Sequence, residues 1–209
     1  KNLNTIAKNH STYKNKPHSQ IMSLFEAKSS FPLEKYSMNF NESIIPNLSF
    51  RLNPSHMKSL TNRNVNVDNI FSINRLGINE AFEEGKSLTI GLDYYKEKFL
   101  TDEEKKFNEE TENKSEQIEK FFEIKLAGVL RDVNEDKISS ATTLNRKTSN
   151  LFGSITNKLH EKIQLDYNFA IDNDLSTFEN NDINLRFHIN NLITSFNFSE
   201  SNGEMGDSN

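Results

Sequence analysis

The residues of this sequence best suited to chemistry are adjacent carboxylates and histidines. Acidic pairs stand at 83–84, 103–104 and 109–110. Neighbouring residues on a strand point to opposite faces, which prevents such a pair from sharing acid–base work. The histidines are His10, His18, His56, His160 and His188, and no two of them have metal-ligand spacing. These residues therefore predict neither a catalytic carboxylate pair nor a metal centre.

The loop and nucleophile motifs of known enzymes and metal sites are also missing. Asp172, Asp174 and Ser176 open like a calcium-binding loop. Thr177 stands where that loop needs glycine and Ile183 where it needs glutamate, so we interpret the stretch as a turn. The chain has no cysteine and no Gly-x-Ser-x-Gly, P-loop or Gly-x-Gly-x-x-Gly motif. The sequence predicts a protein that is not an enzyme and needs no cofactor.

The composition is polar for a folded chain. The net charge is −5, and no basic patch with interleaved aromatic residues predicts a nucleic-acid partner. Hydrophobic residues make up 34% of the chain, against a usual ~45–50%. No apolar run approaches the ~20 residues of a membrane-spanning helix. Such a chain either buries a thin core or leaves its apolar side chains outside the protein interior.

Alternation with a period of two recurs along the sequence and must position any functional side chain. In residues 85–95, GKSLTIGLDYY, four apolar side chains alternate with small or polar ones. The same pattern marks residues 122–130, 163–171, 183–189 and 192–198, and more weakly residues 20–31, 44–52 and 149–159. This period is typical of strands with two unlike faces. We therefore expect an all-β, antiparallel fold of about eight long strands.

The connections between these strands are of two kinds. Tight turns are expected at 159–162, 172–174 and 190–191, and long polar connections at 4–18, 53–67, 100–118 and 132–148. In the connection 100–118, Thr101 and Glu104 could form a capping box at the start of a short helix. Its block of charges nevertheless favours a solvated, irregular connection over a helix.

The polar faces of the strands favour a water-filled lumen over bulk solvent. They carry Thr89, Asp93, Asp166, Asn168 and Arg186. A strand over residues 86–99 is roughly 46 Å long at ~3.3 Å per residue, and a tilt of about 40° leaves roughly 35 Å of height, enough to cross an outer membrane. The pattern favours a segment of a transmembrane β-barrel, whose apolar side chains face lipid and need no interior core. A soluble β-protein, with strands of ~5–6 residues, remains the alternative.

One segment is more specific than alternation. Residues 69–85, NIFSINRLGINEAFEEG, lead directly into the strand SLTIGLDY. The segment resembles the C-terminal barrel region of the outer-membrane lipopolysaccharide (LPS)-assembly protein, the LptD family, through Asn69, Ile70, Phe71, Asn74, Arg75, Glu83, Gly85, Gly91, Leu92 and Tyr94. A hairpin downstream resembles the same family through Asn150, Gly153, Leu165, Tyr167, Phe169, Asp172, Asp174, Leu175, Phe178 and Asn181. The likeness covers roughly residues 20–209.

The resemblance implies transport. Residues 1–209 would form part of one large outer-membrane β-barrel domain of a longer protein, whose periplasmic jelly-roll domain and further strands lie elsewhere in its chain. Such a protein would receive LPS from a periplasmic bridge protein and release it laterally into the outer leaflet, among outer-membrane lipid. A lipoprotein plug would sit in its lumen. A generic porin or transporter barrel and a soluble β-rich binding module remain alternatives. The insertion at 100–118 and the missing cysteines depart from the family pattern.

The connections also predict a topology. If the tight turns at 160–161 and 190–191 are periplasmic, then 100–118 is periplasmic, and 132–148 and 172–174 lie outside the cell. The NIFSINRL segment would then belong to an extracellular excursion, residues 53–85, and would not span the membrane. We further expect that arginine is costly at Ile90 or Leu92, which would face lipid, and tolerated at Thr89, which would face water.

Overall fold

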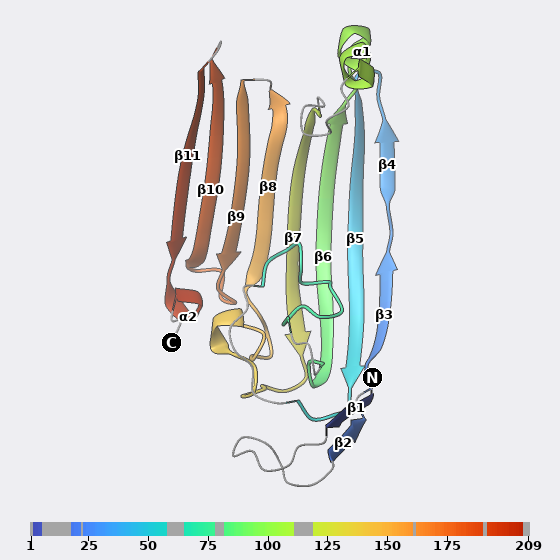
Figure 1. The fold of residues 1–209 in the computed structure, drawn as a ribbon, viewed down its shortest axis with the longest axis vertical. Coiled ribbons are helices and arrows are strands. Elements are labelled where there is room, and N and C mark those ends of the chain that lie inside the picture. Colours follow the sequence, from blue (N-terminus) through green and yellow to red (C-terminus); the bar gives the residue numbers. More distant parts are fainter. Residues whose placement is uncertain are drawn as a thin grey trace.

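A single antiparallel sheet dominates the structure, a computed structural model that describes residues 2–5, 18–21, 23–57, 65–77, 82–110, 119–160, 162–189 and 192–206 (Figure 1). The sheet has nine strands in the order β11-β10-β9-β8-β7-β6-β5-β3, with β4 also paired to β5. Its strands are β3 (Phe25–Ser30), β4 (Leu33–Tyr36), β5 (Phe40–Asn53), β6 (Gly85–Lys98), β7 (Phe121–Arg131), β8 (Leu151–His160), β9 (Ile163–Ile171), β10 (Phe178–Ile189) and β11 (Leu192–Ser201). The all-β, antiparallel prediction is confirmed.

Each long strand pairs with its neighbours in sequence, so the sheet is an open meander with two free edges. β3 pairs with the end of β5 nearest Asn53, and β4 pairs with its other end, so both occupy one strand position. The eight positions that result match the predicted number of strands. A second, two-stranded sheet joins β1 (Asn2–Thr5) to β2 (His18–Ile21), so the strand predicted over 20–31 is in fact interrupted.

The register aligns the alternating residues of all strands into two continuous faces. Ile90 pairs with Leu48 on β5 and with Gly128 on β7, whereas Thr89 pairs with Ser49 and Val129. We call the side of the sheet that carries Ile90 the apolar face and the side that carries Thr89 the polar face. Because side chains alternate strictly along a strand, a slip of one residue would exchange the two faces.

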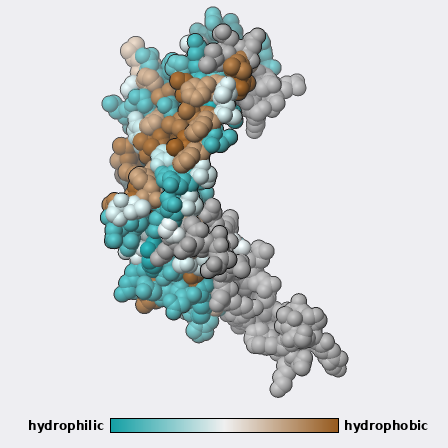
Figure 2. Space-filling view, turned by 90° about the vertical axis from the view of Figure 1, so that its left-hand side faces the viewer, coloured by the Kyte–Doolittle hydropathy of each residue, from teal (hydrophilic) through white to brown (hydrophobic). Residues whose placement is uncertain are grey.

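The apolar face is exposed across the sheet. Ile90 and Leu92 at its centre are 45% and 44% exposed. Other exposed members are Ile44, Leu48, Phe50, Leu130, Ile163, Leu192, Phe196 and Phe198. Seen from the β11 side, apolar residues gather in a band across the upper half of the molecule, with hydrophilic residues above and below (Figure 2). Contiguous exposed apolar surfaces of this kind are uncommon on monomeric soluble proteins.

The buried core lies on the opposite, polar face. Its members from the sheet are Ala127, Val129, Phe152 and Ala170, and its members from the connections are Met57, Val65, Val67, Ile70, Leu76, Ile138 and Leu144. The connections β5–β6 and β7–β8 therefore fold back over the sheet and bring their own apolar side chains with them. The expectation that no interior core is needed is wrong in this respect, because the two long connections supply a small one.

The helices lie outside the sheet. Those among the described residues are α1 (Asp102–Glu110), the 3-10 helix η2 (Ser140–Thr142) and α2 (Gly203–Gly206). The expectation of an irregular connection over 100–118 is wrong for residues 102–110. The capping box starts α1, because the Thr101 amide donates to Glu104 Oε2 at 2.7 Å and the Glu104 amide lies 3.4 Å from Thr101 Oγ1. Lys120, which also contacts Glu104, is the main cause that lowers the pKa of Glu104 to about 2.

The connections alternate between the two ends of the sheet as expected. The end of β8 and the start of β9, the end of β10 and the start of β11, and the helix α1 lie at one end, and the connections β7–β8 and β9–β10 and the described parts of β5–β6 lie at the other (Figure 1). The tight turn predicted at 190–191 lies outside the described residues. The NIFSINRL segment contains no strand, which confirms that it is not a spanning strand of the sheet. The Asp172–Ser176 stretch is a turn, in which Asp172 Oδ1 accepts a hydrogen bond of 2.7 Å from the Ser176 amide. Asp172 acts there as a turn-forming residue, as the sequence predicts.

Candidate functional site

A short run of turns, residues 65–77, lies against the polar face of β5, β6 and β7. Asn66 and Asn69 fix its start, because Asn66 Oδ1 accepts from the Asn69 amide and Asn69 Oδ1 accepts from the Asn66 amide, both at 3.1 Å. Ile70 is fully buried beneath this turn and anchors it to the core. Polar side chains that satisfy nearby backbone groups let the chain turn sharply without unpaired donors. Asn69 thus has a structural role.

Phe71 lies directly on the strand β6 at Gly91. A Cβ atom at position 91 would come within 2.7 Å of Phe71 Cζ, so any residue other than glycine would push the ring away. The carbonyl of Phe71 accepts a hydrogen bond of 2.6 Å from Lys28 Nζ on β3. Gly91 therefore leaves room for the Phe71 ring to pack directly on the sheet. The carbonyl of Phe71 links the excursion to Lys28 of the edge strand β3.

Arg75 forms the centre of the site and is 1% exposed. Its Nε donates to Glu83 Oε2 and its Nη2 to Glu83 Oε1, both at 2.6 Å, which is the bidentate geometry of a strong ion pair. Its remaining donors reach Thr89 Oγ1 at 2.8 Å, Ser87 Oγ at 3.0 Å and the Ile70 carbonyl at 3.4 Å. A guanidinium of five donors is satisfied only because loop and strand both supply acceptors.

Three guanidiniums converge on Glu83. Arg131 at the end of β7 donates to Glu83 Oε1, and Arg51 Nη1 lies 3.9 Å from Glu83 Oε2. Glu26 on β3 balances part of this charge and accepts from Arg51 Nε at 2.9 Å. We call Arg51, Arg75, Arg131 and Glu83 the clamp. Burial raises the pKa of Glu83, but the surrounding guanidiniums outweigh burial and hold that pKa below its usual range.

The clamp continues into the other long connection through Glu84. Glu84 Oε2 accepts from Lys137 Nζ at 2.7 Å and from the Met57 amide at 3.0 Å, and His56 Nδ1 lies 2.8 Å from Oε1. Burial acts to raise the pKa of Glu84, but these hydrogen bonds lower it to about 2. Gly85 follows with φ +92°, a conformation that favours glycine, and a Cβ atom there would lie 3.1 Å from Arg131 Nη2.

The structure brings together part of the family motif. Asn69, Phe71, Arg75, Glu83, Gly85 and Gly91 meet at the clamp or next to it, as described above. Asn74 belongs to the same run of turns, and its carbonyl accepts from the Gly77 amide at 3.0 Å. Tyr94 lies elsewhere, with its ring 6.2 Å from that of Phe122 on the neighbouring strand. Asp172 and Asp174 lie in the β9–β10 turn, away from the clamp.

The five residues predicted to line a lumen all lie on the polar face, but in different surroundings. Asp93 is half-buried and accepts from Asn47 Nδ2 at 2.8 Å. Asp166 and Asn168 are half-buried, and Arg186 is exposed. Thr89 is 0% exposed because Arg75 covers it, so the premise that it faces open water is wrong. Because an arginine at this position would place a fourth guanidinium in the clamp, we now expect Thr89→Arg to be destabilising.

Sequence reasoning missed two of the three arginines. Arg51 and Arg131 are buried on the polar face near the ends of β5 and β7. The available signal in the sequence was one arginine on the polar side of each alternating strand. A second buried cluster was also missed: Asn150 Nδ2 donates to Glu179 Oε2 at 2.6 Å, and Arg146 Nη2 donates to Asn150 Oδ1 at 2.8 Å. This cluster ties the β7–β8 connection to β10.

The chemistry of the site is electrostatic. Its buried carboxylate is held ionised by guanidiniums, which leaves no proton for acid catalysis. Within the described residues, no three His, Asp or Glu side chains are placed to hold a metal ion. Beside the clamp, a groove of about 440 Å³ is lined by Lys28, Asn47, Asp68, Phe71, Asp93 and Lys125 among others. The arrangement can fasten the excursion to the sheet and present mixed charges to solvent.

The fold and the site together define a class of protein. It is an open antiparallel sheet with an exposed apolar face and with a polar face that is partly covered by a loop, which buried ion pairs hold in place. Neither a protein-family model nor a curated protein matches this chain. Among the described helices, none combines the length and the apolar character needed to cross a membrane.

We expect Arg75→Ala to release the excursion from the sheet. The change removes five donors and leaves the buried Glu83 and Thr89 without their main partner, which costs about 3–5 kcal/mol when a buried ion pair loses one member. Hydrogen–deuterium exchange of the full-length protein should show faster exchange over residues 65–77. Arg186→Ala, which removes an exposed arginine on the same face, is the control and should leave exchange unchanged. Equal protection in both variants would contradict the clamp.

Acid should loosen the contacts that Glu84 makes with Met57 and Lys137 in the two long connections. The folded pKa of Glu84 is about 2, below its ordinary value of 4.5, so its stabilising contribution is complete above pH 4.5 and is lost as the pH falls from about 4.5 to about 2. The lowered pKa of Glu83 acts in the same direction. Exchange over residues 53–57 and 132–138, which contact Glu84 through Met57 and Lys137, should therefore accelerate in that window. Glu84→Gln should flatten this pH dependence, and an unchanged acid profile in this variant would argue against the assignment.

Proposed function

We propose that this chain forms part of the wall of an outer-membrane β-barrel that transports lipopolysaccharide to the outer leaflet. The observation that carries the membrane part is the position of two lysines on the exposed apolar face. Lys86 and Lys96 enclose Leu88, Ile90, Leu92 and Tyr94, and they stand ten residues apart on β6. At ~3.3 Å per residue this separation is roughly 33 Å, and a strand tilt of about 40° leaves roughly 25 Å, the height of the apolar band on outer-membrane barrels.

The polar ends of this band support the same placement. Lys96 Nζ lies 2.8 Å from Glu42 Oε1 and 4.3 Å from the centre of the Phe40 ring, so a charged and aromatic group closes the band at one end. Lys86 is exposed at the other end. Long cationic side chains at the border of lipid reach the headgroups while their methylene groups remain in the apolar layer. The two lysines thus suit the two interfaces of a bilayer.

The open edges of the sheet require further strands under this proposal. In a bilayer every backbone N–H and C=O must be paired, and only closed barrels achieve this with strands. β11 and the β3–β4 position have no neighbour on one side. We infer that strands outside this sheet pair with both edges and close the barrel around the polar face. The clamp and its excursion then lie in the lumen.

The choice of lipopolysaccharide rests on the family resemblance of residues 69–85. The residues that carry this resemblance include Arg75, Glu83 and Gly85, which the fold uses to hold the excursion over the polar face. The polar side chains left on that face suit sugars and phosphates in passage. The partners implied are a periplasmic LPS-bridge protein and a lipoprotein plug, with outer-membrane lipid around the barrel. A generic porin or transporter barrel is the competing function.

The apolar face should resist charge in lipid. Ile90→Arg and Leu92→Arg should each cost roughly 2–4 kcal/mol of unfolding free energy near the bilayer midplane. Asn197→Arg is the matched control, because Asn197 is an exposed polar-face residue that pairs with Asn184. Urea titrations of the full-length protein in lipid vesicles measure all three variants. Equal stability at positions 90 and 197 would show that the apolar face does not contact lipid.

Depletion of the full-length protein tests the transport function. We expect newly made lipopolysaccharide to stop reaching the cell surface, with porin folding affected only afterwards, because the barrel carries one lipid class. Pulse labelling with surface detection measures this. Complementation with Asn168→Ala should restore delivery, because a wide wet lumen replaces one contact by water. Normal surface lipopolysaccharide with loss of uptake of a small solute would instead support the generic transporter.

A further inference from the structure

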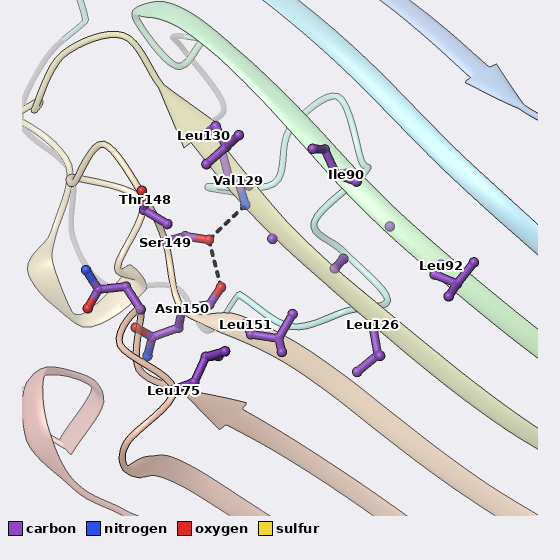
Figure 3. Close-up of a pocket in the computed structure, with 14 residues that line it drawn as sticks. Ile90, Leu92, Leu126, Val129, Leu130, Thr148, Ser149, Asn150, Leu151 and Leu175 are labelled. Atoms are coloured by element: carbon purple, nitrogen blue, oxygen red, sulfur yellow. Dashed lines mark hydrogen bonds between the residues drawn. The ribbon is translucent and has the colours of Figure 1, made fainter.

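We propose that a groove on the apolar face, between β7 and β8, holds one acyl chain of an outer-leaflet lipopolysaccharide molecule. This inference rests on the proposed function, because it requires lipid at this face. The groove has a volume of about 390 Å³, within the range of small-molecule sites. It is lined by Ile90, Leu92, Leu126, Leu130, Leu151 and Leu175 among others (Figure 3).

An irregularity in the strand pairing lies beneath this groove. The regular ladder between β7 and β8 ends at Ala127 and Phe152, and pairing resumes with a shift of one residue at Leu130 and Thr148, as in a β-bulge. Beyond that point the Val129 amide donates to Ser149 Oγ at 2.9 Å instead of a carbonyl, and Ser149 Oγ donates to the Asn150 carbonyl at 2.8 Å (Figure 3). The ladder is therefore locally disrupted beside Gly128, which carries no side chain to fill the space, although the Ser149 amide still donates to the Val129 carbonyl at 2.9 Å.

Leu175 supplies a second, independent feature at the end of the groove. It has φ +58°, a conformation that few residues without a small or polar side chain adopt, and its side chain is 65% exposed. The turn around it is held by Asp172, whose carbonyl accepts from the Leu175 amide at 3.0 Å. A leucine with positive φ is strained, and its exposed apolar side chain is unfavourably hydrated in bulk water. It suits a hydrocarbon ligand.

The position of the groove selects the occupant. It lies on the end of the sheet that carries the connections β5–β6, β7–β8 and β9–β10, which the topology of the proposed barrel places toward the cell exterior. The lipid in that leaflet is the barrel's own cargo. Thr148 and Asn173 also line the groove and supply polar groups where an acyl chain meets its sugar headgroup. A chain delivered by the barrel can therefore rest here after release.

Photo-crosslinking on the full-length protein in cells tests the groove. A photoreactive phenylalanine analogue at Leu130 should crosslink to lipopolysaccharide more strongly than the same analogue at Phe196, a groove-free position on the apolar face. Gly128→Leu should abolish the crosslink by filling the groove. Its added Cβ would lie 3.7 Å from the Asn150 carbonyl oxygen and 3.9 Å from Ser149 Oγ, which are ordinary van der Waals contacts. Thr194→Leu adds a similar side chain on β11 and should leave the crosslink intact.

Leu175→Gly separates binding from stability. Glycine relieves the positive φ and should keep or raise the urea midpoint, while loss of the leucine should lower the crosslink at position 130. A crosslink at position 130 to phospholipid would overturn the choice of occupant. Equal crosslinks at positions 130 and 196, or no effect of Gly128→Leu, would overturn the groove as a site. No lipid crosslink at either position would instead refute the membrane proposal itself.

Discussion

The ion pair between Arg75 and Glu83 determines how the rest of the molecule is arranged. Both groups are buried on the polar face, where an unpaired charge would be prohibitively unstable. Their bidentate contact, completed by Arg51 and Arg131, allows a polar surface of a sheet to be covered by a loop. Buried ion pairs add little net stability compared with apolar contacts, but they penalise every alternative placement of their members. The clamp therefore specifies where the excursion lies more than it strengthens the fold.

The two faces of the sheet reverse the usual distribution of polarity. Apolar side chains are exposed on one side, while serines, threonines, arginines and a glutamate are buried on the other. This reversal explains why a chain with 34% hydrophobic residues folds into long strands at all. The small core under the two long connections contributes the ordinary hydrophobic stabilisation, and the strands themselves depend on backbone pairing. Such a division is stable where the surroundings of the apolar face are themselves apolar.

Most of the sheet could be predicted from the sequence, because alternation with a period of two is a local property. It placed the six long strands after residue 84, the one over 149–159 only weakly, and assigned alternating residues of the other five to two faces. The site could be predicted only in part. Arg75 and Glu83 share one segment and stood out as a motif, whereas Arg51 and Arg131 join them only through pairing across β5, β6 and β7. The burial of Thr89 depends on its contact with Arg75, and the helix over 102–110 depends on the capping box at its start. Alternation indicates neither of them.

The clamp joins residues that lie far apart in the sequence. Arg51 comes from β5, Arg75 and Glu83 from the excursion, and Arg131 from the end of β7, while Glu26 of β3 pairs with Arg51. In a meander each strand pairs with its neighbours in sequence, so the contacts within each hairpin are local. Until β7 has joined, Glu83 lacks Arg131 and the loop lacks part of its anchorage. The cluster is therefore complete only when the strands from β5 to β7 are paired in register, which couples the position of the loop to the pairing of the sheet.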